Sequence, residues 1–211
     1  MKLFIHKIGL VLLMAVLVMP VAAKVTYGVR FGGAYSSLIQ KVDGEFNSGA
    51  RFGFSVAGLA DIPLYKRFSL RPELSFVNQG GSYYSAPQME GMGYLNKCSY
   101  YSIVVPVNLA YTFLFTDVRF SIFAGPAFDY SLFGKMKNKE TDTDILFGQT
   151  KDKDLKSFDL GVNLGLGVEY SNFFFSIAAF CGTLDRRAAK NEGETSVYQN
   201  NVTFSLGYFF R

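Results

Sequence analysis

The chain has 211 residues, enough for one domain, and its 21 Lys and Arg against 17 Asp and Glu give a formal net charge of +4. A charge this close to neutral gives no support to a nucleic-acid partner. Hydrophobic residues make up 49% of the chain, with 22 Phe and 13 Tyr, which is unusually aromatic for a soluble domain. Beyond the N-terminal segment no stretch approaches 18 consecutive apolar residues, so membrane-spanning helices are excluded.

Residues 1–23 have the organisation of a secretory signal peptide. Two lysines come before an apolar run of about 12 residues, and small residues at positions 21–23 offer a cleavage site. The run is too short to span a bilayer as a helix, which needs about 20 residues. We therefore predict cleavage after Ala23. The mature domain, residues 24–211, then has 188 residues and a net charge of +2, because the removed segment carries two lysines and no acid.

Eight stretches of the mature chain alternate apolar residues with small or polar ones. Successive side chains leave a strand on opposite faces, so a period of two predicts strands. The connections between them are alternately long and short, which is typical of an outer-membrane barrel. The sequence therefore predicts an all-β fold, an eight-stranded antiparallel transmembrane barrel built as an up-and-down meander. In chain order the strands are expected at residues 25–36, 49–60, 67–79, 98–113, 118–132, 155–170 and 173–183, and after residue 196.

The connections divide into two sets, one for each end of the barrel. Short turns are expected at residues 61–66, 114–117 and 171–172, and Pro63 fits the first because proline cannot sit in the middle of a sheet. Long connections are expected at residues 37–48, 80–97, 133–154 and 184–196. The longest of these holds more charged residues than any other connection and is interpreted as a solvated loop.

The apolar face of the predicted strands is expected to meet lipid. The opposite face is mostly Gly, Ala, Ser and Asn, and small residues fit the interior of an eight-stranded barrel, which has room for side chains and little more. Strands of this length exceed the roughly 9–11 residues that cross a bilayer, so several should project beyond it. Aromatic girdles are expected from tyrosines near the strand ends: Tyr27, Tyr35, Tyr101, Tyr111, Tyr130, Tyr170 and Tyr208.

The inward face carries charges of both signs. They are interpreted either as a selective pore or proton path, or as a structural network, because charges removed from bulk water must be paired. Four positive and four negative charges are near balance, which favours a network that fills the lumen. The predicted lumen charge network is Arg30, Arg51, Arg71, Glu73, Arg119, Asp129, Asp159 and Glu169.

Catalysis is not expected. Nucleophile-and-base arrangements mostly recruit histidine, and the single histidine, His6, lies in the predicted signal peptide. No cofactor is predicted, because the glycines at 161, 165 and 167 lack the spacing of a nucleotide loop and instead give steric relief inside the barrel. No metal is predicted either. Asp142 and Asp144 match part of a calcium loop, but its glycine and terminal glutamate are missing. Cys98 and Cys181 fall on strands that are not neighbours and are expected to be unpaired.

Four segments carry a resemblance to a known family: residues 68–74, 122–127, 160–170 and 204–210. Together they resemble the porin-like, PorT-type outer-membrane β-barrel family of Bacteroidetes-type Gram-negative bacteria. The resemblance implies export, assembly by the barrel-insertion machinery and, for most members, no assigned activity; a few members are linked to protein secretion. The chain departs from the family at Ser102, where a glutamate is frequent. It departs again at Arg211, which follows the terminal aromatic of the expected assembly signal, Tyr208 and Phe210.

The leading functional hypothesis is a structural or interaction platform: a barrel with a side-chain-filled lumen that displays its long loops outside the cell. The alternatives are a small passive porin and an accessory subunit of an outer-membrane secretion or uptake complex. An even number of strands places both termini in the periplasm. The expected partners are outer-membrane lipid, the insertion machinery and a protein at the extracellular loops.

Overall fold

The computed structural model describes residues 25–42, 45–85, 94–138, 141–188 and 195–211. The predicted signal peptide lies outside the described residues. Within them no helix is long and apolar enough to cross a membrane. The strands are β1 (Thr26–Val42), β2 (Glu45–Tyr65), β3 (Phe68–Ser85), β4 (Tyr94–Phe115), β5 (Val118–Lys137), β6 (Asp142–Asp144), β7 (Phe158–Tyr170), β8 (Phe173–Gly182) and β9 (Val197–Phe210).

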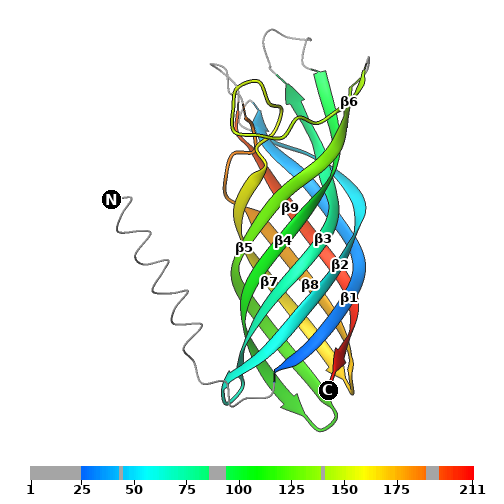
Figure 1. Cartoon of the computed structure of the whole chain (residues 1–211), viewed down its shortest axis with the longest axis vertical. Coiled ribbons are helices and arrows are strands. Elements are labelled where there is room, and N and C mark those ends of the chain that lie inside the picture. Colours follow the sequence, from blue (N-terminus) through cyan, green and yellow to red (C-terminus); the bar gives the residue numbers. More distant parts are fainter. Residues whose placement is uncertain (1–24, 43–44, 86–93, 139–140, 189–194) are drawn as a thin grey trace, which may run out of the picture.

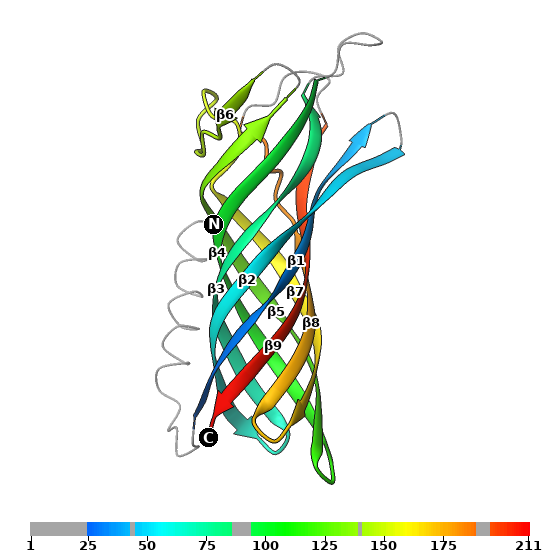
Figure 2. The ribbon, with the colours of Figure 1, turned by 90° about the vertical axis from the view of Figure 1, so that its right-hand side faces the viewer.

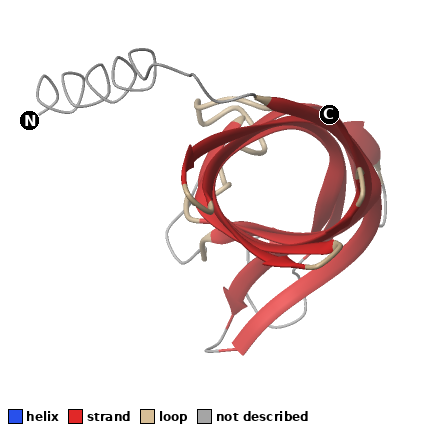
Figure 3. Cartoon of the chain, turned by 90° about the horizontal axis from the view of Figure 1, so that it is seen from below, coloured by secondary structure: helices blue, strands red, loops and turns tan. Residues whose placement is uncertain are grey.

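The strands close into a barrel. Each long strand pairs antiparallel with its neighbours in the chain, β5 pairs with β7, and β1 pairs with β9 to complete the circle (Figures 1 and 3). The short β6 only adds to the outer part of β5. Among the described residues, eight strands therefore form the closed wall, and the predicted eight-stranded antiparallel barrel is confirmed.

The two ends of the barrel differ in their connections. One end, called the turn end below, holds the two-residue turns at 66–67, 116–117 and 171–172, together with the start of β1 and the C-terminus (Figure 2). Two of these turns contain a non-glycine residue with positive φ, Lys66 at 52° and Ser171 at 57°. The opposite end, called the loop end, receives all the longer connections.

Most strands run further toward the loop end than the alternation predicts. Parts of the expected connections 37–48, 80–97 and 133–154 belong to strands, because the backbone ladder continues where the outward face turns polar, as at Lys97 and Lys135. The prediction for Pro63 was also wrong. It lies in β2 opposite Ser69, beside an irregularity in the β2–β3 register, where its missing N–H is tolerated.

The apolar face points outward, as predicted. On β1, Val29 and Phe31 are exposed while Arg30 is buried in the lumen. Outward aromatic pairs form two belts. Phe68 and Tyr111, with ring centroids 4.9 Å apart, belong to the belt nearer the turn end. The belt nearer the loop end includes Tyr101 and Phe133, 5.0 Å apart. Beyond this second belt the strands continue, so part of the barrel projects past the lipid-facing zone.

Inward aromatic rings fill the lumen by lying on glycines of neighbouring strands. A Cβ at Gly165 would come within 2.3 Å of the Phe123 ring, and one at Gly161 within 2.5 Å of the Phe180 ring. Phe174 lies against Gly207 in the same way. The glycines therefore give the steric relief that the sequence predicts.

A cap covers the loop end. We define it as residues 145–157 and 183–188, two segments that lie near that end (Figure 1). Backbone hydrogen bonds join them to each other, Lys156 N–H to the Arg186 carbonyl at 2.7 Å, and to the wall, Ile145 N–H to the Gly134 carbonyl at 2.9 Å. The interpretation of the longest connection as a solvated loop was therefore incomplete. Its apolar residues pack into the mouth of the barrel, in a buried cluster of Leu38, Tyr83, Cys98, Tyr100, Ile145, Leu155 and Val197.

Candidate functional site in the barrel lumen

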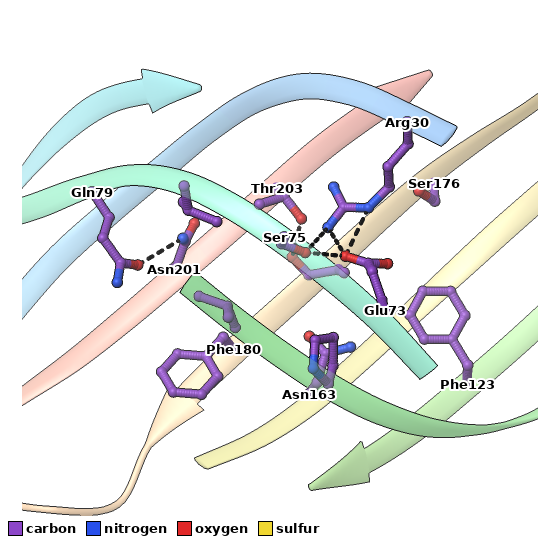
Figure 4. Close-up of a pocket in the computed structure, with 14 residues that line it drawn as sticks. Arg30, Glu73, Ser75, Gln79, Phe123, Asn163, Ser176, Phe180, Asn201 and Thr203 are labelled. Carbon is purple, nitrogen blue, oxygen red and sulfur yellow. Dashed lines mark hydrogen bonds and ion pairs between the residues drawn. The ribbon is translucent and has the colours of Figure 1, made fainter. Parts of the chain in front are cut away.

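The middle of the lumen holds a buried ion pair. Arg30 on β1 reaches Glu73 on β3, with its Nε 3.0 Å from Oε1 and a second, shorter contact from Nη2 (Figure 4). The same guanidinium donates to the hydroxyls of Ser205 at 2.7 Å and Ser75 at 3.3 Å. Phe123 projects toward the pair from β5. A charge in such a site must be paired and hydrogen-bonded, and Arg30 is both.

Two further acids, Asp61 and Glu169, are paired with arginines nearer the turn end. Arg71 binds Asp61, with Nε 3.1 Å from Oδ1, and Asp61 therefore lies in the lumen instead of in the turn predicted at residues 61–66. Glu169 is contacted by Arg119 at 3.6 Å and by Arg211, whose guanidinium also lies 5.4 Å from the Phe209 ring centroid. The Arg119 side chain is 47% exposed, so it lies at the rim more than in the lumen.

Arg51 differs from the other predicted arginines. It donates to the Asn78 side-chain oxygen at 2.8 Å and to the Gln79 carbonyl at 3.0 Å. No carboxylate among the described residues forms an ion pair with it. The predicted four-against-four balance therefore does not describe the actual pairing.

Asp129 and Asp159 form a separate site beneath the cap. They face each other across the β5–β7 ladder and are both fully buried. The cation that interacts electrostatically with both is Arg186, a cap residue that no strand periodicity marks; within the described part of the chain it forms no direct ion pair with either carboxylate. Arg186 is itself 0% exposed, donates to the Ser131 hydroxyl at 2.6 Å and lies 5.8 Å from the Tyr100 ring centroid.

The surroundings of Arg186 act on its pKa in opposite directions. Burial alone lowers the pKa of its guanidinium, but the adjacent Tyr100 and two carboxylates raise it by more, so the pKa lies above its ordinary value. The Asp159 carboxylate also accepts a hydrogen bond from the Leu184 N–H at 3.2 Å, which ties the cap backbone to the wall. Gly182 leaves room for this carboxylate, because a Cβ there would lie 2.3 Å from it.

The free space in the lumen is small and divided. One cavity of about 40 Å³ lies on the loop side, lined by Gln79, Phe180 and Asn201 among others. A second of about 40 Å³ lies on the turn side, near Arg71 and Glu169. Each has room for a few water molecules. Both are lined by Arg30, Glu73, Phe123 and Ser176, which therefore stand between them.

The described part of the chain also places the candidate metal ligands and the two cysteines. No group of three His, Cys, Asp or Glu side chains there is arranged to hold a metal ion, and Glu140, in the longest connection with Asp142 and Asp144, lies outside that part. Both cysteines are free, Cys98 buried under the cap and Cys181 exposed on the outer wall.

The C-terminal strand carries the expected assembly signal on its outer face. Tyr208 and Phe210 point outward with ring centroids 5.4 Å apart, while Phe209 between them is buried in the lumen. Arg211 does not interrupt this alternation, because its side chain turns to Glu169.

A closed antiparallel barrel with an apolar, aromatic-belted exterior and a charged, filled interior defines a small membrane-spanning β-barrel protein. The comparison with protein families agrees: a model described as the outer membrane protein beta-barrel domain matches residues 20–181. The chain belongs to this family. It is accordingly a barrel of the cell outer membrane, in contact with lipid and assembled by the barrel-insertion machinery.

Several solved structures are similar to this chain. Neisserial surface protein A is 14% identical and has a TM-score of 0.49, with 89% of this chain and 100% of that chain covered. The attachment invasion locus protein Ail of Yersinia pestis is 13% identical, with a TM-score of 0.47 and the same coverage. Outer membrane protein OprG from Pseudomonas aeruginosa is 12% identical, with a TM-score of 0.48 and 88% and 96% covered. No curated protein matches the sequence.

Proposed function

We propose that the protein is a non-conducting outer-membrane barrel that serves as an interaction platform, presenting its loop end to the outside of the cell. The observation that carries this proposal is the division of the lumen by Arg30, Glu73 and Phe123 into two cavities of about 40 Å³, each with room for a few water molecules. The packed cap over the loop end supports it further. The proposal includes no catalytic step.

Conductance tests the proposal against the porin alternative. The purified wild-type protein in a planar bilayer should give no steady, reproducible channel, because side chains occupy the bore. A matched variant, Arg30→Ser/Glu73→Ser/Phe123→Ala, removes the partition while keeping the charge balance, and should show measurable current. Steady conductance by the wild-type protein would refute the platform and favour a passive porin.

Orientation is part of the proposal, with both termini in the periplasm and the cap outside. A protease-cleavable tag inserted between Thr150 and Lys151, both exposed in the cap, should be cut on intact cells. The same tag between Lys66 and Arg67 at the turn end should be protected. The reverse pattern would show that the barrel is inserted the other way.

An interaction platform needs an exposed surface that a partner can bind, and the tip of the longest connection is such a surface. Lys151, Asp152 and Lys153 lie there, and Lys153 forms an ion pair with Asp152 at 3.0 Å. Changing all three to serine should preserve folding, because Ile145 and Leu155 still fill the mouth. Partners captured by the tagged wild-type protein from native outer membranes should be lost by this variant. Capture that is unaffected would place the binding surface elsewhere.

A second candidate role, as an accessory subunit of a secretion or uptake complex, rests on the resemblance to the PorT-type family. The finer assignment to that family is likewise our proposal. Stable co-purification with larger outer-membrane proteins in mild detergent would favour this role. Migration as an isolated barrel under the same conditions would favour the simple platform.

A further inference from the structure

The two buried carboxylates under the cap form a site that requires a cation. Asp129 and Asp159 are directly opposite each other in the β5–β7 register and neither is exposed to solvent. Two like charges held together away from water repel each other and are poorly solvated, so a positive group must accompany them. Among the described strand residues none forms an ion pair with these acids, and Arg51, the predicted arginine on the loop side, is bound instead to Asn78 and the Gln79 carbonyl.

The cation comes from the cap, and it is incompletely bound. The Nη2 atom of Arg186 donates to Ser131, but its buried Nε and Nη1 have no hydrogen-bond partner among the described protein atoms. The same holds for Oδ1 of Asp129 and Oδ2 of Asp159. The site therefore holds two donors on Arg186 and two aspartate oxygens, all without a hydrogen-bond partner in the described part of the chain. The Tyr100 ring lies on one side of the guanidinium.

We propose that Asp129, Asp159 and Tyr100 form a recognition site for a guanidinium-type cation, and that Arg186 occupies it as an internal ligand that latches the cap shut. The cap is then a lid. Asp159 binds the Leu184 N–H of one cap segment, and the Arg186 carbonyl accepts from the Lys156 N–H of the other. Both cap segments are therefore held by the same latch. An arginine from a partner protein would compete with Arg186 for the two carboxylates and release the lid.

Cys98 reports the state of the lid. It belongs to the buried cluster under the cap and is 2% exposed, whereas the other cysteine, Cys181, is exposed on the outer wall and can be changed to alanine. In the Cys181→Ala background, a water-soluble maleimide should label Cys98 slowly. Arg186→Ala should speed labelling about tenfold, a factor that corresponds to roughly 1.4 kcal/mol, because it removes the buried cation beside two buried carboxylates and its hydrogen bond to Ser131.

Matched variants separate a latch from a general loss of structure. Arg71→Gln also removes an ion-paired arginine from the lumen, but at the turn end, and should leave Cys98 labelling unchanged. The shift in gel mobility between unboiled and boiled samples shows which variants are folded. If Arg186→Ala does not fold, Asp129→Asn/Asp159→Asn tests the same latch by removing the carboxylates instead of the cation, and should also expose Cys98.

Chemical rescue tests the recognition site itself. Guanidinium chloride at about 10 mM, far below the molar range that unfolds proteins, should slow Cys98 labelling again in Arg186→Ala. Sodium chloride at equal ionic strength should not, and guanidinium should have no effect on Asp129→Asn/Asp159→Asn. Unchanged Cys98 labelling in a folded Arg186→Ala variant, or no rescue by guanidinium, would overturn the proposal, as would rapid labelling of Cys98 in the protein with Arg186 intact.

Discussion

Both halves of the lumen contain buried acids, but the arginines that accompany these acids come from different parts of the chain. In the middle and toward the turn end, acids are paired with arginines carried by the strands or their ends, as in Arg30 with Glu73 and Arg71 with Asp61. Toward the loop end, the strands contribute two acids, and the arginine comes from a connection.

Because of this difference, we expect substitutions in the two halves to affect different properties of the barrel. In a pair carried by two strands of a closed barrel, both residues are fixed to the wall by their backbones, so the pair contributes to the stability of the barrel itself. A cation carried by a connection can leave while every strand remains paired. The turn half should therefore respond to substitution with changes in unfolding free energy, and the loop half with changes in accessibility.

The largest effect is expected from Glu73→Ala, which leaves the Arg30 charge buried without its carboxylate. Removing one partner of a buried pair costs about 3–5 kcal/mol, and the hydroxyls of Ser75 and Ser205 that still bind Arg30 place this case toward the lower end. Urea unfolding of the barrel in lipid vesicles measures the loss. The exposed Lys97→Ala should show no change. If Glu73→Ala also shows none, water already solvates Arg30, and the porin hypothesis gains.

An intermediate effect is expected from a glycine pair on β1. A Cβ at Gly32 would lie 2.0 Å from the backbone oxygen of Phe204, so Gly32→Ala must push two strands apart at a cost of about 1–3 kcal/mol. Its neighbour Gly33 has nothing within 4 Å of a new Cβ, and Gly33→Ala should be neutral or slightly stabilising. Equal unfolding free energies for the two variants would contradict a tightly packed lumen wall.

A smaller effect is expected from Asp159→Asn at the loop end. The substitution removes one of two repelling charges, leaves the Asp129 carboxylate in the field of Arg186, and keeps an oxygen to accept from the Leu184 N–H. We expect the unfolding free energy to fall by less than about 1 kcal/mol, the usual net worth of one hydrogen bond. Glu73→Gln, measured alongside, should cost more. A larger loss for Asp159→Asn would mean that the loop half also controls global stability.

The sequence predicted the barrel, its strand number and its lipid-facing side because a period of two extends over each strand. It misplaced strand ends such as those of β1 and β5, since the backbone ladder continues after the outward residues become polar. Which charged residues pair with each other was harder to predict than where the strands lie. Asp61 was assigned to a turn because of the nearby Pro63, and its bond to Arg71 depends on the β2–β3 register, which alternation alone does not fix.

Arg186 could not be found by the same reasoning. It lies in a connection, where side-chain direction follows no period, and its burial results from long-range packing of the cap against Tyr100 and Leu155. One signal was present in the sequence: the strands of the loop half place Asp129 and Asp159 inside with only Arg51 nearby. An excess of inward acid on one half of a barrel indicates that a connection must supply the cation.

The smallest effect is expected at the turn end, from Arg211→Ala. Arg211 binds Glu169, but it is 25% exposed, and Arg119 remains 3.6 Å from the same carboxylate. A partly exposed pair with a substitute cation contributes about 0.2–1 kcal/mol, and the difference from wild type should shrink further in about 1 M salt, where the Debye length is near 3 Å. Unfolding measured at low and high salt tests this. Assembly should be unaffected, because Tyr208 and Phe210 keep their outward alternation. A salt-independent loss above about 2 kcal/mol would show that Arg211 is the main counter-ion of Glu169, and that even the turn half depends on a residue outside the strands.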